Sequence, residues 1–354
     1  MCKILVRANA DVGIEDMRRR TPIDVAWMEI IAGSRPRKFL EELRTLFGDK
    51  DHFELRRPQL LHRIILGFSK INLEDALPDL SLDDINARDE EGKTALCWAV
   101  LSGNLSAVQA LLEAGADPNI CDYAKDTPLM FGAYSRNPAI LTTLVAGGAK
   151  FTANDRKDTA LHKAAFRQDD PRYIRPFLDP SLGADINALS DCQETPLGLA
   201  TLQNHARTVK FLAKHGANIE HVDEGDKTAL FDAIKYKCHE AMQALLDCGA
   251  DPTFSQQSGD TLLHNLAEWG ELKALEVVKS VDLSGIDVDA QNQRGLTAMQ
   301  VADLRINRPK GFTDAFGELL EWIRDSQDDY QSAVSIISSD SEYETPDIKP
   351  SKLV

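Results

Sequence analysis

The 354-residue sequence has few aromatic residues (6%), only six cysteines and no long apolar run. No stretch approaches the roughly 20 apolar residues that span a bilayer, and the apolar run at the N-terminus is too short for a signal peptide. None of the cysteines forms a CxxC pair, which is typical of reduced thiols. We therefore expect a cytoplasmic or nuclear protein that is not embedded in a membrane.

Positive charge is in the minority. Lysine and arginine total 40 against 56 aspartate and glutamate, which gives a net charge of −16. Because such a field repels phosphate at long range, we expect no nucleic-acid partner and no binding to anionic membranes.

The motifs of common enzymes are also missing. The sequence contains no GxxxxGK[ST] phosphate loop, no GxSxG elbow and no HExxH pair. Three nearby histidines, His205, His215 and His221, fit no metal-ligand spacing. The sequence therefore predicts no enzyme activity, no cofactor and no metal site.

What the sequence does contain is a block repeated at nearly constant spacing. In each copy a threonine precedes proline, alanine or leucine and then an apolar residue, with alanine at the sixth place in most. Successive threonines lie 33, 32, 36, 33, 33 and 36 residues apart. These copies begin at Thr94, Thr127, Thr159, Thr195, Thr228, Thr261 and Thr297. An earlier copy begins at Thr21, and a degraded one has Gln59 in place of threonine.

A second block, glycine followed by alanine, comes later in most copies. Threonine is a common helix N-cap, and glycine suits a left-handed helix C-cap. The residues between the blocks, such as 105–112, are apolar at helical spacing. Each copy thus predicts a pair of helices, and such pairs must stack because one pair cannot bury its own apolar face. The glycines are Gly115, Gly148, Gly183, Gly216 and Gly249.

These blocks resemble the ankyrin repeat, with its Thr-Pro-Leu-His-x-Ala signature and period of about 33 residues. The resemblance covers residues from about 3 to 325. It implies an all-α fold, an ankyrin-repeat α-solenoid of about nine helix–turn–helix units with hairpin fingers. It also implies that His162, His264 and His62 bridge backbone groups of adjacent units.

The sequence departs from the family pattern at several places. The two 36-residue spacings indicate insertions within 170–182 and 277–287. Four residues stand where the fingers usually carry glycine: Lys125, Lys157, Gln193 and Asp226.

The two ends differ from the rest. Residues 1–20 look like the second half of a repeat, and we expect a partial, truncated unit there. The solenoid then covers 21–325, with a capping helix from Phe312. Residues 326–354 are rich in serine and acids, which predicts a disordered tail.

The resemblance implies that partners bind on a concave face lined by the first helices. Counting from each threonine, the seventh and eighth following residues usually point toward that face, and the fourth points partly toward it. From Thr94 to Thr195 the fourth and seventh residues form an apolar stripe, whereas those of the next two copies are polar. An apolar peptide or an amphipathic helix would lie across this stripe. The stripe consists of Trp98, Leu101, Phe131, Tyr134, Phe166, Leu199 and Leu202. Packing of Trp98, Phe131 and Leu199 against adjacent first helices is the alternative interpretation.

A second candidate contact lies in the tail. Three β-branched apolar residues followed by serines and acids are similar to a SUMO-interacting motif, which would bind by adding a strand to a sheet edge. The residues are Val334, Ile336, Ile337, Ser339, Asp340, Ser341 and Glu342. A plain solubilising tail is the alternative.

The sequence as a whole indicates a monomeric, non-enzymatic scaffold or adaptor that binds a protein partner. Two alternatives remain open. The chain could be a substrate-recognition or regulatory subunit in SUMO or ubiquitin pathways. It could instead be the targeting half of a larger enzyme truncated at its N-terminus.

Overall fold

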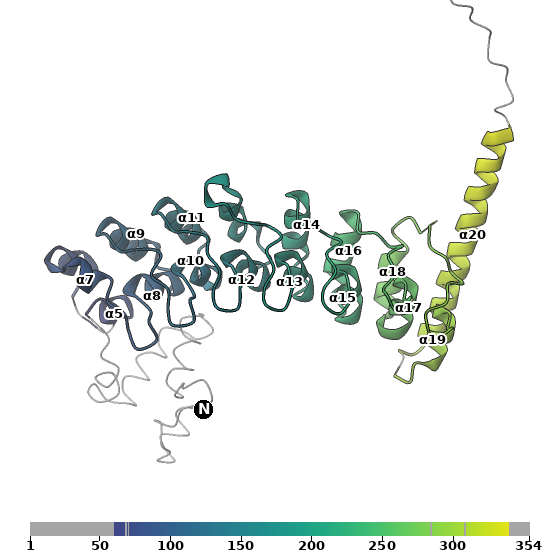
Figure 1. Cartoon of the computed structure of the whole chain (residues 1–354), viewed down its shortest axis with the longest axis horizontal. Helices are drawn as coiled ribbons and strands as arrows, with labels where there is room; N and C mark the ends of the chain where they lie inside the picture. The colour runs from purple at the N-terminus through teal and green to yellow at the C-terminus, as the bar shows by residue number, and fades with distance from the viewer. Residues whose placement is uncertain (1–59, 68, 70, 284, 308, 340–354) are drawn as a thin grey trace, which may run out of the picture. The chain divides into compact units, whose positions relative to one another are not determined.

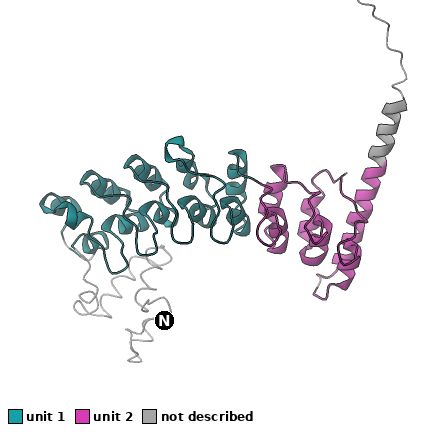
Figure 2. Cartoon of the chain, in the orientation of Figure 1, with its two compact units in different colours: residues 1–218 teal, residues 219–354 magenta. Residues whose placement is uncertain are grey.

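The computed structural model describes residues 60–67, 69, 71–283, 285–307 and 309–339, with side chains as far as Asp328. The predicted partial unit 1–20 and the copy at Thr21 lie outside the described residues, as do residues 340–354. The chain divides into two compact units, residues 1–218 and 219–354 (Figure 2).

The helices of unit 1 form two layers (Figure 1). The described part begins with α5 and the short elements that follow it, and each threonine then starts a first helix. Neighbouring first helices pack on one another, α8 on α5 and α10, and α12 on α10 and α13. The first-helix layer consists of α5 (Leu60–Ile65), α8 (Ala95–Leu101), α10 (Pro128–Phe131) with the 3₁₀ turn η2 (Gly132–Tyr134), α12 (Ala160–Arg167) and α13 (Pro196–Leu202).

The second layer of unit 1 is less regular. Its elements are α6 (Leu73–Ala76), η1 (Leu77–Asp79), α7 (Leu82–Ile85), α9 (Leu105–Glu113), α11 (Ala139–Ala146) and α14 (Ala206–Lys214). In the copy that begins at Thr159, three 3₁₀ turns replace the second helix: η3 (Pro171–Tyr173), η4 (Arg175–Leu178) and η5 (Pro180–Leu182). Prolines at 171, 176 and 180 explain this, because proline lacks the N–H that a continuous helix needs. These irregular turns lie in the stretch 170–182, where the sequence predicts an insertion.

Unit 2 repeats the same plan. Its first helices are α15 (Ala229–Lys235), α17 (Leu262–Trp269) and α19 (Ala298–Leu304), and its second helices are α16 (His239–Asp247) and α18 (Leu272–Val278). The helix α20 (Phe312–Ser339) packs on α18 and α19. The described residues form helices, turns and isolated β-bridges without an extended strand. The predicted all-α solenoid is confirmed.

The helix boundaries follow the two blocks of the repeat. The hydroxyl of Thr195 accepts a hydrogen bond from the Gly198 N–H at 3.1 Å, and Thr94, Thr127 and Thr159 cap in the same way. Thr228 is an exception and begins α15 without a side-chain cap bond. The five predicted C-terminal glycines all have positive φ, from 58° to 95°. Local sequence therefore fixes where most of the helices begin and end.

Buried histidines tie successive copies together. The Nδ1 atom of His162 accepts a hydrogen bond from the N–H of Thr159 at 3.1 Å. Its Nε2 atom therefore carries the proton and donates to the carbonyl of Glu194 in the next copy at 3.1 Å. His264 makes the same pair of contacts, and Nε2 of His62 lies 3.0 Å from the Lys93 carbonyl. The bridging role implied by the resemblance is confirmed.

The fingers are tight turns, closed in several copies by an isolated bridge such as Arg88 to Thr94. The four residues that replace the usual glycine keep its left-handed backbone, with φ of 64°, 55°, 57° and 59°. They are Lys125, Lys157, Gln193 and Asp226. A side chain in this conformation costs about 1–2 kcal/mol, so each of these fingers holds a local strain.

The predicted disordered tail is wrong for its first part. The helix α20 continues past Arg324 to Ser339, where disorder was expected from Ser326. Residues 318–339 contain neither glycine nor proline, so nothing breaks the helix. The side chain of Gln327 also donates to the carbonyl of Ile286 at 2.7 Å, which holds this turn against the last repeat.

Two equivalent finger positions should respond in opposite directions to substitution. Replacing Lys125 with glycine removes the strain and should stabilise the protein by about 0.5–1 kcal/mol, after the entropy of glycine in the unfolded chain is subtracted. Replacing Gly92 with alanine should destabilise it by about 2 kcal/mol or more, because the new Cβ would lie 2.9 Å from the backbone nitrogen of Tyr123. Urea denaturation measures both, and an equal response at the two positions would contradict this account.

The bridging histidine should make stability depend on pH. Burial lowers the pKa of His162, whereas in the unfolded chain it is about 6.5. The unfolded state therefore binds the proton first, and stability present at neutral pH is lost as the pH falls below about 6.5 toward the folded pKa.

The variant His162→Gln isolates this effect. Glutamine at the corresponding position of α19, Gln300, makes the same capping contact with Thr297 without titrating. The difference in unfolding free energy between wild type and variant should shrink from pH 7.5 to pH 5.5. A constant difference over this range would rule out titration of His162.

Candidate functional site

The first-helix surface of unit 1 contains the seven residues predicted to bind a partner. Tyr134 and Phe166, at the seventh position, are 37% and 40% exposed. Trp98, Leu101, Leu199 and Leu202 are partly exposed. Their helices are neighbours in the stack, so these partly exposed side chains lie on successive first helices from α8 to α13. We call these six residues the first-helix stripe.

Phe131 does not belong to the exposed row. It is only 7% exposed, because α10 packs between α8 and α12. The packing alternative is therefore correct for this residue, and Phe131 supports the stripe rather than facing a partner.

Trp98 is held by polar contacts at the base of the finger. Its Nε1 donates to Asp89 at 2.7 Å, and the Lys93 ammonium lies 5.7 Å from its ring and 5.6 Å from the ring of Phe131. Burial acts to lower the pKa of Lys93, but the carboxylates around it, led by Glu91, outweigh this and raise the pKa. The lysine thus stays charged between the two rings, and the indole is fixed in orientation.

In the next copies along the stripe, charged side chains lie close to the aromatic side chains. The guanidinium of Arg167 lies 4.9 Å from the ring centre of Tyr134. At the fourth position of α12, Lys163 is buried and pairs with Asp158 at 2.8 Å. The side chains at the seventh positions of the stripe are therefore apolar or aromatic. Ion pairs and cation–π contacts within the protein hold the neighbouring side chains in place.

Sequence reasoning missed a second exposed group, in unit 2. Tyr236, Trp269, Leu304 and Ile306 are 55%, 42%, 62% and 94% exposed. The Lys235 ammonium lies 5.2 Å from the Tyr236 ring and 5.9 Å from the Trp269 ring. Arg305 donates to the Gly270 carbonyl at 2.7 Å, which joins the ends of α17 and α19.

A signal for this group was present in the sequence. Tyr236 and Trp269 stand at the eighth position after their threonines, one residue beyond the seventh positions that gave the stripe. The fourth and seventh positions of these copies are polar, as expected, but they do not describe the whole surface. We call Tyr236, Trp269, Leu304 and Ile306 the second apolar group.

The candidate motif in the tail lies in two places. Val334, Ile336, Ile337 and Ser339 belong to α20 and have a helical backbone, whereas Asp340, Ser341 and Glu342 lie outside the described residues. Adding a strand to a sheet edge needs an extended backbone, so this part of α20 would have to unwind first.

Two of the three histidines considered as metal ligands make contacts with other parts of the chain. Nδ1 of His205 is 2.9 Å from the Ala165 carbonyl, and the ring centre of His215 lies 4.2 Å from that of Phe211, with the rings tilted by 36°. Within the part of the chain that the structure describes, no group of three histidine, cysteine or acidic side chains is placed to hold a metal ion. In the same residues, no helix is both long and apolar enough to cross a membrane.

Comparison with known proteins gives one family. Residues 67–155 and 161–256, more than half of the chain, match the family described as ankyrin repeats (3 copies). Inversin of dog, Canis lupus familiaris, is 29% identical over 235 residues, which are 64% of this chain and 20% of inversin. The human B-cell lymphoma 3 protein is 30% identical over 224 residues, 61% of this chain and 49% of that protein. The chain thus spans half or less of the length of these relatives.

Solved structures agree. The crystal structure of the ankyrin repeat domain of Bcl-3, described as a unique member of the IkappaB protein family, matches with a TM-score of 0.54 and 28% identity. The match covers 64% of this chain and 99% of that one. The human ASB11 ankyrin repeat domain matches with the same TM-score at 20% identity, over 64% of this chain and 98% of that one, which supports the fold alone.

Two phenylalanines near the stripe should differ in their effect on stability. Replacing the buried Phe131 with alanine should lower the free energy of unfolding by about 3–5 kcal/mol through the cavity it leaves. Replacing the 40% exposed Phe166 should cost about 1 kcal/mol. Urea denaturation of both variants tests this, and similar losses would contradict the assignment of Phe131 to the interior.

Proposed function

Because the chain belongs to the ankyrin-repeat family, whose repeats bind protein partners, we propose that it is a non-enzymatic adaptor that holds a partner on its first helices. The observation that carries this proposal is the pair of half-exposed aromatic rings, Tyr134 and Phe166, at the same position of successive copies. Such rings bury a large area at a small cost in side-chain entropy and often dominate binding energy.

The stripe suits an extended apolar peptide or the apolar face of a helix. Its rings stand on rigid helices, so little ordering is needed when a partner binds. Trp98 is fixed by Asp89, and Arg167 rests on Tyr134. Because Arg167 is itself exposed, it adds a polar group beside the apolar side chains, as in the usual pattern of an apolar centre with a polar rim.

The second apolar group extends the proposal to unit 2. Tyr236 and Trp269 lie at equivalent positions of successive first helices, and Lys235 lies near both rings. Exposed rings on both units give the chain two separate candidate binding surfaces, one in each unit.

The remaining parts of the proposal concern context. We propose a monomeric protein of the cytoplasm or nucleus, in keeping with cysteines that form no CxxC pair and with a net charge of −16. The helical backbone of Val334, Ile336 and Ile337 favours the adaptor over SUMO binding through the tail.

A double variant tests the adaptor function. Tyr134→Ala with Phe166→Ala should keep the fold and weaken partner binding by at least about 2 kcal/mol, roughly thirtyfold. Quantitative affinity capture on wild type and variant measures the loss for each co-purified protein, and thermal unfolding checks the fold.

The matched control is Tyr236→Ala with Trp269→Ala. Partners lost with the first pair but kept with the second bind the stripe, and the reverse pattern places binding on the second apolar group. If both folded variants retain every specific partner of the wild type, the first helices are not the binding surface.

A further inference from the structure

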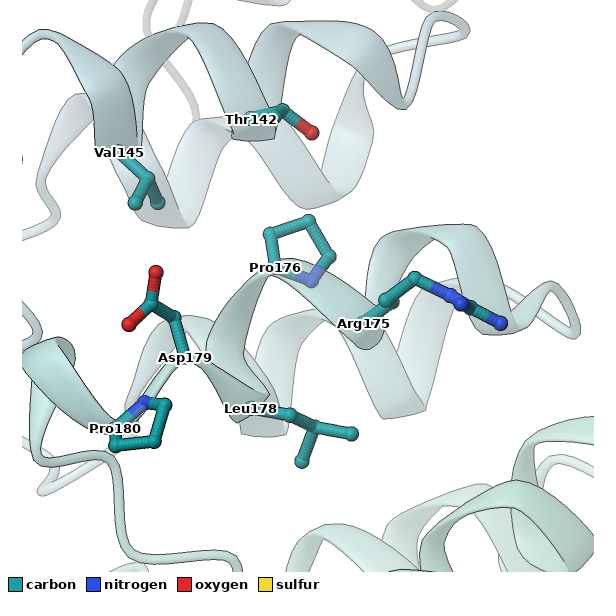
Figure 3. Close-up of a pocket in the computed structure, with 7 residues that line it drawn as sticks. All are labelled: Thr142, Val145, Arg175, Pro176, Leu178, Asp179 and Pro180. Atoms are coloured by element: carbon teal, nitrogen blue, oxygen red, sulfur yellow. The ribbon is translucent and has the colours of Figure 1, made fainter.

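The outer layer of unit 1 contains a pocket that the first-helix surface does not use. It has a volume of about 440 Å³ and lies between α11 and the turns η4 and η5. Figure 3 shows Thr142 and Val145 on one side, with Pro176, Leu178, Asp179 and Pro180 across the space and Arg175 at its edge. We call these seven residues the outer pocket.

The pocket exists because this copy lacks a second helix. The three 3₁₀ turns follow a different path from a regular helix, and each begins at or beside a proline. Much of the wall is apolar, formed by Val145, Pro176, Leu178 and Pro180. An apolar pocket of this size can seat one large side chain.

Positive charge gathers beside the pocket. Arg175 lies 5.8 Å from the ring of Phe211 on α14, so the pocket edge continues onto that helix. On α14, Arg207, Lys210 and Lys214 are exposed, and the helix carries no acid. Among the second helices that the structure describes, α9, α16 and α18 all contain acids, and α11 has no charge. The basic outer face of α14 is therefore unusual in a chain of net charge −16.

The acids near this cluster are already engaged. Asp170 forms a paired hydrogen bond with Arg172, and Asp169 accepts the N–H of Thr208 at 2.9 Å. Asp179 at the pocket accepts the N–H of Ser181 at 2.9 Å and caps η5. These hydrogen bonds leave the three carboxylates charged, but the nearby cations outnumber them. The field around α14 and η4 is therefore positive on balance, although the molecule as a whole is negative; the cations are Arg172, Arg175, Arg207, Lys210 and Lys214.

We propose that the outer pocket and α14 together form a docking site for a short acidic segment of a partner protein. One apolar side chain of that segment seats against Val145, Pro176 and Leu178. Its carboxylates face Arg175, Arg207 and Lys214. The proposal does not depend on the first-helix surface, which lies in the other layer of the unit.

Charge selects this occupant over a nucleic acid. At physiological salt the positive field of α14 acts over about 8 Å, which suffices for a peptide with a few carboxylates. A long polyanion would also meet the negative remainder of the chain. The apolar wall adds a requirement that phosphate and sugar do not satisfy.

A labelled peptide tests the site directly on the full chain. The probe is a short fluorescein-labelled peptide of glutamate and aspartate with one central leucine. Fluorescence anisotropy should show saturable binding, with a dissociation constant on the order of 100 µM or tighter, that weakens as salt rises. Replacing the leucine of the peptide with serine should weaken binding about fivefold.

Two charge reversals provide a matched pair. Lys214 is the last residue of α14, and Lys279 is the C-cap residue of α18, so a glutamate meets a similar helix end at both. Lys214→Glu should weaken peptide binding about tenfold or more, and Lys279→Glu by less than about twofold. Val145→Ser should reduce the advantage of the leucine peptide over the serine peptide, and thermal unfolding verifies that each variant is folded.

Each contrary result overturns the proposal in a recognisable way. Equal weakening by the two reversals would mean that only total charge matters. Absence of saturable binding to folded wild type removes the site, and tighter binding of a single-stranded oligonucleotide would assign it to another class of partner. Markedly tighter peptide binding by a chain ending at Ser339 would identify residues 340–354 as the native occupant instead of a separate partner. None of these outcomes tests the proposed binding on the first helices, which the Tyr134/Phe166 and Tyr236/Trp269 variants test separately.

Discussion

A pair of short helices cannot bury its own apolar face, and every other feature of this structure follows from that constraint. Each copy must lie on the next, and the buried imidazoles show how the contact is fixed: His162 caps its own helix with one nitrogen and reaches Glu194 of the next copy with the other. Each bridge joins one copy to the next. A nearly constant spacing of threonines in the sequence therefore produces a regular stack of first helices in the structure.

The features that repeat in sequence were predictable because their causes are local. Threonine caps, glycine ends and histidine bridges each depend on a few adjacent residues and one neighbouring copy. The left-handed conformation persists even at Lys125 and Asp226, where the glycine is lost, since the finger on either side imposes it. The 36-residue spacing likewise indicated an insertion within 170–182, although not the 3₁₀ turns found there or the pocket beside them.

Exposure was harder to predict because it depends on packing between copies. Phe131 and Tyr134 are three residues apart, yet one is buried and the other is open. Trp269 follows polar positions and was overlooked, although it is among the exposed aromatics. The tail was misread for a related reason: its composition is that of a disordered segment, but Gln327 finds a backbone partner on the last repeat and no residue breaks the helix. The contacts between charged groups and aromatic rings on the stripe could not be predicted from the sequence either, because Arg167 and Tyr134 come from different helices.

The length of α20 makes it a spacer. Its 28 residues correspond to about 42 Å of helix at 1.5 Å per residue, and Gln327 makes the contact with Ile286 roughly half-way along. From there to Ser339 the helix advances about 18 Å further. A fluorophore, surface tether or fused domain attached after Ser339 would thus start well clear of Gln327 and its contact with the last repeat.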